Sequence, residues 1–349
     1  CRLEPEGEIC AIWVADGGEG TVDAFLAAGG GTRAEVPCTG PCGQEVMGFY
    51  GLLPDGTAVV EMAAAAGLPL AGAWRDPEKT TTHGVGQLMA PALSRGAKRL
   101  VLGLGGSATN DGGCGAAAAL GAEFLDEEGR AFVPTGGTLT QIAHIRMEVL
   151  RETLAGAEVT VMCDIDNPLC GPAGAAAVFG PQKGADAAMV ARMDAGLRHL
   201  AETLEKNVGM EVLTLAGGGS AGGFGAGAAA FFGGQLRMGI DVVLDLTDFD
   251  RKCRGASLVI TGEGHLDSQS LRGKTVVGVA RRARALGVPA AALVGGCETA
   301  LDAVYAEGVS GVFPIHPALC TWPQAAARTE EDLRFTMGNL LRFMAALRR

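Results

Sequence analysis

The sequence contains few aromatic residues and no excess of positive charge. Aromatic side chains make up 5% of the 349 residues, which leaves little material for the stacking platforms that bind single-stranded nucleic acid. Lysine and arginine number 28 against 39 aspartates and glutamates, giving a net charge of −11. A nucleic acid partner is therefore not expected. An anionic substrate would have to be held by local basic groups and helix N-termini.

Paired cysteines, a secretory leader and a convincing membrane span are also missing. The ten cysteines are scattered, and the one close pair, Cys38 and Cys42, lacks the further ligands of a zinc site. Thiols of this kind predict a cytoplasmic protein. The uncharged stretch Val212–Leu236 is long enough to cross a bilayer. Because nine of its residues are glycine, we expect a buried loop and a helix start there, and no membrane partner.

Glycine, by contrast, is abundant, and strand-like and helix-like segments alternate along the chain. The 55 glycines are about twice the usual share of roughly 7%, without a collagen-like period. The length favours two domains over one, and the alternation is typical of α/β folds. We expect strands at Glu8–Val14, Lys98–Leu102 and residues 158–166, and helices at Met189–Asn207, Val276–Leu286 and over the last thirty residues.

The stretch "GLGGSATNDGG", Gly103 to Gly113, follows an apolar run and permits three interpretations. Its first six residues match the G-x-G-x-x-A form of the dinucleotide fingerprint, with Asp126 near the expected distance. That fold needs a helix to begin inside the fingerprint, but Asn110–Gly113 disfavours one. The second interpretation is a simple turn of small residues. The third is an anion cradle of backbone N–H groups with three side-chain donors, Ser107, Thr109 and Asn110.

Two further loops favour the anion cradle. "GPQKGA" sets Lys183 between glycines as an exposed cation, and "TGEGHLDSQSLRGKT", Thr261 to Thr275, lies between an expected strand and a helix. Ligands of α/β folds bind at such carboxyl ends of strands. The second loop fails the P-loop signature, because Ser268 stands where a glycine is required. It retains Glu263, Asp267 and Lys274.

These groups suit phosphoryl transfer, which requires carboxylates for Mg²⁺, a group near the accepting hydroxyl, and cations on the phosphates. Carboxylates beside glycine, asparagine or turn residues are Asp16, Glu19, Asp111, Asp164, Asp166, Glu263 and Asp267. Each by itself is more often a cap or a loop hydrogen-bonder. Of the five histidines, His265 lies inside a candidate loop, and the others have no triad or metal spacing.

Five long motifs together resemble the type 1 glycerate kinases. They are "VADGGEGT" at Val14–Thr21, "GLGGSATNDGG", "CDIDNPLCGPAGAAAVFGPQKGA" at Cys163–Ala185, "LAGGGSAGGFGAG" at Leu215–Gly227, and "VITGEGHLDSQSLRGKTVVGVA" at Val259–Ala280. The resemblance implies a phosphotransferase with an alcohol group as acceptor. It would use ATP and Mg²⁺ to convert D-glycerate to 2-phosphoglycerate or 3-phosphoglycerate.

The resemblance also implies an α/β fold of two domains, in which a Rossmann-like parallel sheet domain is interrupted by a second α/β domain. We place the first at residues 1–60 and 250–349 and the inserted one at residues 61–249. We assign catalysis to Asp164 or Asp267, and metal binding to Asp164 and Glu263. Nucleotide and phosphate binding is assigned to Gly105, Gly106, Ser107, Thr109, Asn110, Gly262, Glu263, Gly264 and Lys274. Substrate binding is assigned to Asp16, Glu19, Thr21, Lys183, Gln269 and Ser270.

The sequence departs from the family pattern in two places. Family members usually open with a strand and a loop of the type "APDSFKGSLSA", which this sequence does not show, and His265 stands where arginine is common. A catalytically silent, N-terminally truncated member is therefore the main alternative, and an NAD-dependent oxidoreductase a lesser one. The resemblance leaves open whether the protein is a homo-oligomer.

Overall fold

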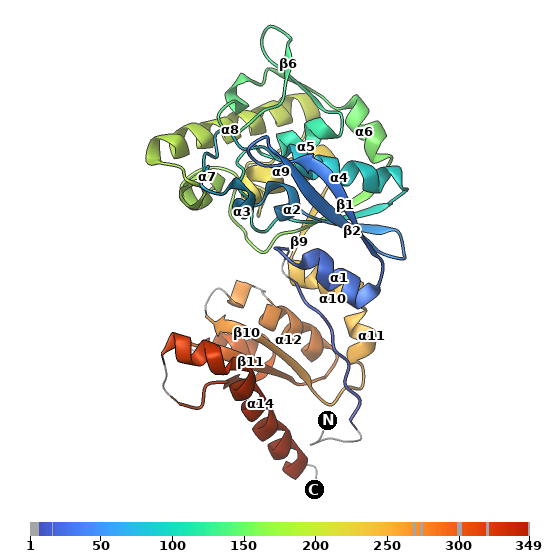
Figure 1. Ribbon diagram of the computed structural model, residues 1–349, viewed down its shortest axis with the longest axis vertical. Helices are drawn as coiled ribbons and strands as arrows, with labels where there is room; N and C mark the ends of the chain where they lie inside the picture. Colours follow the sequence, from blue (N-terminus) through green and yellow to red (C-terminus); the bar gives the residue numbers. More distant parts are fainter. Residues whose placement is uncertain are drawn as a thin grey trace. The chain divides into compact units, whose positions relative to one another are not determined.

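The chain forms two compact units, each with its own sheet. The computed structural model describes residues 7–15, 17–267, 270–272, 275–298, 302–318 and 321–347. The larger unit comprises Ala15–Val242, and the smaller unit comprises Cys1–Val14 with Val243–Arg349. Both contain helices and parallel strands (Figure 1), which confirms the α/β class.

The larger unit is built on a six-stranded sheet with the order β1-β2-β3-β4-β8-β9. Strands β1, β2 and β3 are antiparallel, whereas β3, β4, β8 and β9 run parallel. The expected strand at Lys98–Leu102 is confirmed as β4. The strand bounds are β1 Thr32–Thr39, β2 Glu45–Leu52, β3 Thr57–Glu61, β4 Arg99–Gly103, β8 Glu158–Met162 and β9 Gln235–Arg237.

The boundary expected at residue 60 falls inside this sheet. Residues 15–60 belong to the larger unit because β1 and β2 continue its hydrogen-bonded ladder, with Gly51 of β2 opposite Val59 of β3. The C-terminal boundary likewise lies at Val243, ahead of the expected residue 250. The sequence analysis expected no strand at the positions of β1 and β2, and so it placed the boundary too late.

Helices of the larger unit pack around a single apolar core. Helix α8, Ala187–Val208, confirms the amphipathic helix expected at Met189–Asn207, and α4, His83–Ser94, packs against α5, Cys114–Ala119 (Figure 1). Phe124 and Phe231 meet edge to face with ring centroids 5.7 Å apart, a favourable aromatic geometry.

The uncharged stretch expected to be a buried loop and helix start contains α9, Ser220–Phe232. Its first turn is irregular, because Ala221, Gly222 and Gly223 all adopt left-handed backbone conformations. In the part of the chain that the structure describes, no helix is long and apolar enough to span a membrane.

The remaining elements of the larger unit are short. A small antiparallel sheet has the order β6-β5-β7. Its strands and the other helices are β5 Glu123–Leu125, β6 Ala131–Phe132, β7 His144–Arg146, α1 Thr21–Gly29, α2 Ala63–Ala66, α3 Leu68–Ala71, α6 Glu148–Leu154 and α7 Ala175–Phe179. Two 3₁₀ turns cover Leu139–Gln141 and Pro181–Lys183, and α10, Gly239–Leu246, spans the boundary between the units.

The smaller unit is built on a parallel sheet of three described strands, β10-β11-β12, contacted by α12 (Figure 1). Helices α12 and α14 confirm the helices expected at Val276–Leu286 and near the C-terminus. The elements are α11 Phe249–Cys253, β10 Val259–Leu266, a 3₁₀ turn Ser270–Arg272, α12 Thr275–Ala285, β11 Ala290–Cys297, α13 Asp302–Ala306, β12 Val309–Pro314 and α14 Trp322–Leu347.

Two expectations for the smaller unit are wrong. Strand β10 continues through Leu266, because its ladder with β11 extends to the pair Leu266 and Cys297, so the expected loop begins about five residues later. The strand expected at Glu8–Val14 is absent, since residues 7–15 form no regular secondary structure. Ile9 and Trp13 there are exposed.

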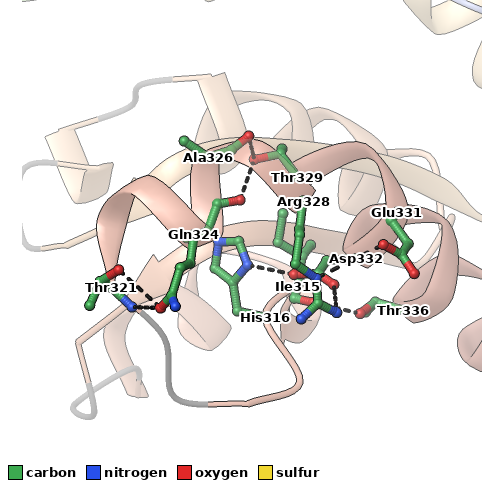
Figure 2. A network of polar contacts seen from close by, with 11 residues as sticks. Ile315, His316, Thr321, Gln324, Ala326, Arg328, Thr329, Glu331, Asp332 and Thr336 are labelled. Carbon is green, nitrogen blue, oxygen red and sulfur yellow. Dashed lines mark hydrogen bonds and ion pairs between the residues drawn. The ribbon is translucent and has the colours of Figure 1, made fainter.

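A polar network joins the segment after β12 to α14 (Figure 2). Asp332 of α14 is buried and accepts hydrogen bonds from Arg328 and His316, each 3.0 Å long. The Thr336 hydroxyl donates to the carbonyl of Ile315 over 3.3 Å. His316 therefore has a structural role, which agrees with its lack of catalytic spacing in the sequence.

Candidate functional site

Three of the motifs meet at one edge of the larger unit's sheet. Glu61, Gly103 and Met162 are paired across β3, β4 and β8 at the carboxyl ends of these parallel strands, where α/β folds bind ligands. The Gly105 N–H donates to the Gly17 carbonyl over 2.9 Å. A Cβ on Gly105 would lie 2.5 Å from the Cα of Gly18. The glycines therefore permit a backbone contact that no larger residue would allow.

The "GLGGSATN" loop is hydrogen-bonded as a loop and does not open a helix. Helix α5 begins only at Cys114, so the fingerprint lacks the helix start of a dinucleotide site, as expected. Neighbouring backbone holds the loop: the Leu68 N–H donates to the Gly106 carbonyl and the Ala108 N–H to the Ala66 carbonyl, over 2.8 and 2.9 Å. Gly106 is exposed, Gly105 is partly exposed, and Ser107, Thr109 and Asn110 are buried.

Lys183 contacts this loop, but it is not the exposed cation that the sequence predicts. Its side chain is 2% exposed, and Nζ donates to Ser107 Oγ over 2.8 Å and to the Thr109 carbonyl over 2.6 Å. The following Gly184 packs so closely on Arg75 that a Cβ would lie 2.2 Å from its carbonyl oxygen. Burial lowers the Lys183 pKa from 10.5 to about 7.

We therefore expect the wild type and a Lys183→Met variant to differ in how their free energies of unfolding depend on pH. Between pH 7 and 10.5 the unfolded lysine binds a proton that the folded lysine releases, so the wild-type free energy of unfolding rises with pH relative to the variant. The limiting slope is about 1.4 kcal/mol per pH unit. Urea unfolding at pH 6, 7.5 and 9 measures it. Lys79→Met, at a lysine that is 75% exposed, is the control and should show no slope. A pH-independent difference for Lys183→Met would contradict the lowered pKa.

Asp111 anchors the end of the loop, a role that the sequence analysis did not assign. Its carboxylate is fully buried and accepts hydrogen bonds from the Thr82 N–H and hydroxyl over 2.7 and 2.9 Å. The N–H groups of Gly113 and Gly115 donate to it over 3.1 and 3.3 Å. Burial raises its pKa, and these donors oppose that rise. In the sequence, the position of Asp111 before a glycine pair at a helix start could have indicated this role.

Thr109 and Asn110 carry buried polar atoms without a hydrogen-bond partner in the structure. These are Thr109 Oγ1 and both side-chain amide atoms of Asn110. Leaving such a group buried and unpaired costs about 1–3 kcal/mol, so each case requires a structural or functional explanation. The structure thus brings the predicted donors of the loop together, and the side chains of Thr109 and Asn110 have polar atoms that make no hydrogen bond.

The "DGGEGT" loop leads into α1. Glu19 is exposed, with Oε1 4.0 Å from a Cβ built on Gly106, whereas the Thr21 hydroxyl is buried and donates to the Gly18 carbonyl over 2.8 Å. Asp16 lies outside the described residues. The sequence analysis missed Glu61, which accepts from the N–H groups of Val22 and Gly20 over 2.5 and 3.3 Å. Its burial raises its pKa.

Asp164 lies two residues beyond β8 at the same sheet edge. Its side chain is partly buried, and Oδ1 accepts from the Gly239 N–H over 2.6 Å at the start of α10. Asp166 is exposed. The structure thus places Asp164 at the carboxyl edge, with one oxygen held by a helix N-terminus.

The smaller unit contains the remaining predicted site residues. Gly262, Glu263 and Gly264 lie within strand β10, whereas the sequence analysis placed them in a loop. Beyond the strand, Asp267 and Ser270 are mutually bonded: the Asp267 N–H donates to Ser270 Oγ over 3.3 Å and the Ser270 N–H to Asp267 Oδ1 over 3.2 Å. Gln269 and Lys274 lie outside the described residues.

The two glycines of β10 can be distinguished by mutation. A Cβ on Gly262 would lie 2.3 Å from the Leu293 carbonyl oxygen, whereas one on Gly264 would meet nothing within 4 Å. We expect Gly262→Ala to destabilise the protein by about 1–3 kcal/mol, and Gly264→Ala to leave thermal unfolding unchanged. If a ligand approaches Gly264 closely, Gly264→Ala should still raise a KM about tenfold. Unchanged kinetics of a stable Gly264→Ala would remove this glycine from the site.

The fold and the site define the chain as an α/β protein with a glycine-rich loop at the carboxyl edge of a parallel sheet, where such folds bind ligands, a class that includes phosphotransferases. A family model described as the glycerate kinase family matches residues 2–345. The chain therefore belongs to the glycerate kinase family, whose members, as kinases, use ATP.

Known proteins of the family are similar over nearly the whole chain. A glycerate kinase of Bacillus subtilis is 46% identical over 96% of this chain and 88% of its own length. A glycerate 2-kinase of Escherichia coli is 41% identical over 93% of this chain and 86% of its own length. A crystal structure described as "putative glycerate kinase 2" from Salmonella typhimurium has a TM-score of 0.88 at 41% identity, covering 99% of this chain and 91% of that one.

Proposed function

We propose that the chain is a type 1 glycerate kinase that transfers the γ-phosphoryl group of ATP to the 2-hydroxyl of D-glycerate in the cytoplasm. The choice of the 2-hydroxyl is supported by the Escherichia coli relative, which is named a glycerate 2-kinase. The observation that carries the proposal is the meeting of the "DGGEGT", "GLGGSATN" and "CDID" segments at one sheet edge. Phosphoryl transfer depends on such positioning of polar groups.

In this proposal the cradle of the larger unit holds anionic oxygen. Gly105 and Gly106 let a ligand approach the backbone, since neither carries a side chain and both are accessible. Thr109 and Asn110 supply polar atoms that lack partners in the structure. Glu19 is the exposed carboxylate beside Gly106, and Thr21 acts indirectly by fixing the Gly18 carbonyl.

Asp164 is the proposed group near the accepting hydroxyl, and Asp267 is the alternative. The Gly239 N–H fixes the Asp164 carboxylate at the sheet edge, and a positioned carboxylate can accept a proton from a substrate hydroxyl. In the smaller unit, Ser270 holds Asp267 in a comparable way. The nucleotide assignments of Gly262, Glu263, Gly264 and Lys274, and the substrate assignment of Gln269, belong to the same proposal.

Mg²⁺ fits the donor set as an ion completed by substrate. Among the described residues, no group of three or more histidine, cysteine, aspartate or glutamate side chains could hold a metal. Mg²⁺ in kinases is commonly bound by one or two carboxylates and by phosphate oxygens. Asp164 in the larger unit is one candidate carboxylate, and Glu263 in the smaller unit is another. When bound, the ion would neutralise charge on the transferred phosphoryl group.

The decisive experiment gives the protein D-glycerate, Mg²⁺ and ATP, followed by enolase without phosphoglycerate mutase. Phosphoenolpyruvate appears only if the 2-hydroxyl has been phosphorylated, and this is the expected result. ADP formed without phosphoenolpyruvate would indicate the 3-hydroxyl instead. No ADP above a control lacking glycerate would overturn the proposal.

A further inference from the structure

The buried amino group of Lys183 contacts the cradle at two points and determines what the loop can donate. An amino group has three N–H donors when it is protonated and two when it is neutral, and two donors reach Ser107 Oγ and the Thr109 carbonyl. A serine hydroxyl that accepts from this group keeps its own proton for another acceptor. Ser107 is 9% exposed and follows the exposed Gly106, so this proton lies at the accessible end of the loop.

The second contact acts on the polar atoms that lack partners. By holding the Thr109 carbonyl, Lys183 fixes the peptide that links Thr109 to Asn110. Thr109 Oγ1 and Asn110 Nδ2 are buried donors without partners, and a ligand with anionic oxygens would satisfy them. Hydrogen bonds to such oxygens are strong in a region of low dielectric, and below pH 7, where Lys183 is protonated, its charge strengthens them further.

We propose that Lys183 is a positioning residue of the glycerate kinase site, which makes the Ser107 hydroxyl a donor to an anionic oxygen of substrate without contacting the substrate itself. The oxygen belongs either to the carboxylate of glycerate or to a phosphate of ATP. The inference rests on the proposed function and deepens it, because the sequence analysis gave Lys183 a direct contact with substrate.

The test is a double-mutant cycle of Ser107→Ala, Lys183→Met and the double variant, with KM measured separately for D-glycerate and ATP. Each single variant should raise one of the two KM values roughly tenfold to a hundredfold, and the substrate affected identifies the anion. The double variant should be no worse than the poorer single variant, since Lys183 acts through Ser107. Effects that multiply in the double variant would overturn the inference.

Ser107→Thr and Lys79→Met are the matched controls. Threonine retains the hydroxyl, so Ser107→Thr should raise KM less than Ser107→Ala does, whereas a purely steric role of Ser107 would make the larger residue the more harmful. Lys79→Met removes a charge at an exposed lysine and should change neither KM. If Lys183→Met does not fold, Ser107→Ala still decides, because two unchanged KM values in that variant would contradict the inference.

Turnover by the wild type distinguishes a failure of the proposed function from a failure of the Lys183 inference. Without turnover of D-glycerate and ATP by the wild type, the proposed function fails and the inference fails with it. With turnover and independent effects of the two substitutions, the proposed function stands and the inference alone is overturned.

Discussion

Asp164→Asn is expected to lower kcat for D-glycerate by roughly 10²–10⁴-fold, the usual size of a lost general base. Asparagine has nearly the same shape, and its side-chain oxygen can still accept from the Gly239 N–H at the start of α10. The variant therefore removes the negative charge while retaining the contact with the helix. Steady-state kinetics with saturating ATP measure the effect, and thermal unfolding should show that the fold is retained.

Asp166→Asn is the matched control for this prediction. It removes an equal charge two residues along the chain from an exposed position, and kcat should change less than twofold. Full turnover by Asp164→Asn would exclude Asp164 as the catalytic carboxylate and leave its contact with Gly239 as its role. Asp267→Asn would then be the next variant to measure.

Gly222→Ala is expected to lower the free energy of unfolding by roughly 2–5 kcal/mol, the sum of a strained backbone and a steric clash. Gly222 has φ +69°, and a Cβ there would lie 2.0 Å from the Thr109 carbonyl oxygen and 2.6 Å from the Asn110 Cα. Because both neighbours are backbone atoms, the cradle itself would have to move. Urea unfolding measures the loss, and any folded fraction should show a raised KM.

Gly233→Ala, at the C-terminal cap of the same helix, provides the control. Gly233 has φ +63°, but a Cβ there would meet nothing within 4 Å. This variant should lower the free energy of unfolding only by the cost of the left-handed backbone conformation, roughly 1–2 kcal/mol, and its KM values should be unchanged. Equal losses for the two variants would show that the close approach of α9 to the loop is unimportant.

Local sequence patterns were sufficient for the elements with strong periodicity or flanking signals. Helix α8 was predicted to within two residues at its start, and α12 to within one at each end, since apolar spacing and terminal glycines act over short distances. Strand β10 was predicted too short, because glycine and charge usually indicate a loop. Its extension through Leu266 depends on pairing with β11, a distant segment.

In the candidate site, local patterns likewise indicated some residues and missed those that depend on distant segments. The loop residues from Gly105 to Asn110 were recognised from composition and from the missing helix start. Glu61 and the buried state of Lys183 were not, because both depend on what packs against them: the N-terminus of α1 for Glu61, and the "GLGGSATN" loop for Lys183. No local pattern encodes such contacts.

By itself, the sequence determined the α/β class, the resemblance to glycerate kinases and the segments from which a site could be built, because periodicity, turn chemistry and motif order are properties of neighbouring residues. Only the tertiary structure decided that residues 15–60 belong to the larger unit, that Lys183 lies behind the cradle, and that Asp164 is held at the start of α10. These features arise from strand pairing and burial between segments far apart in the chain, which set both the direction of a side chain and the free energy of its charge.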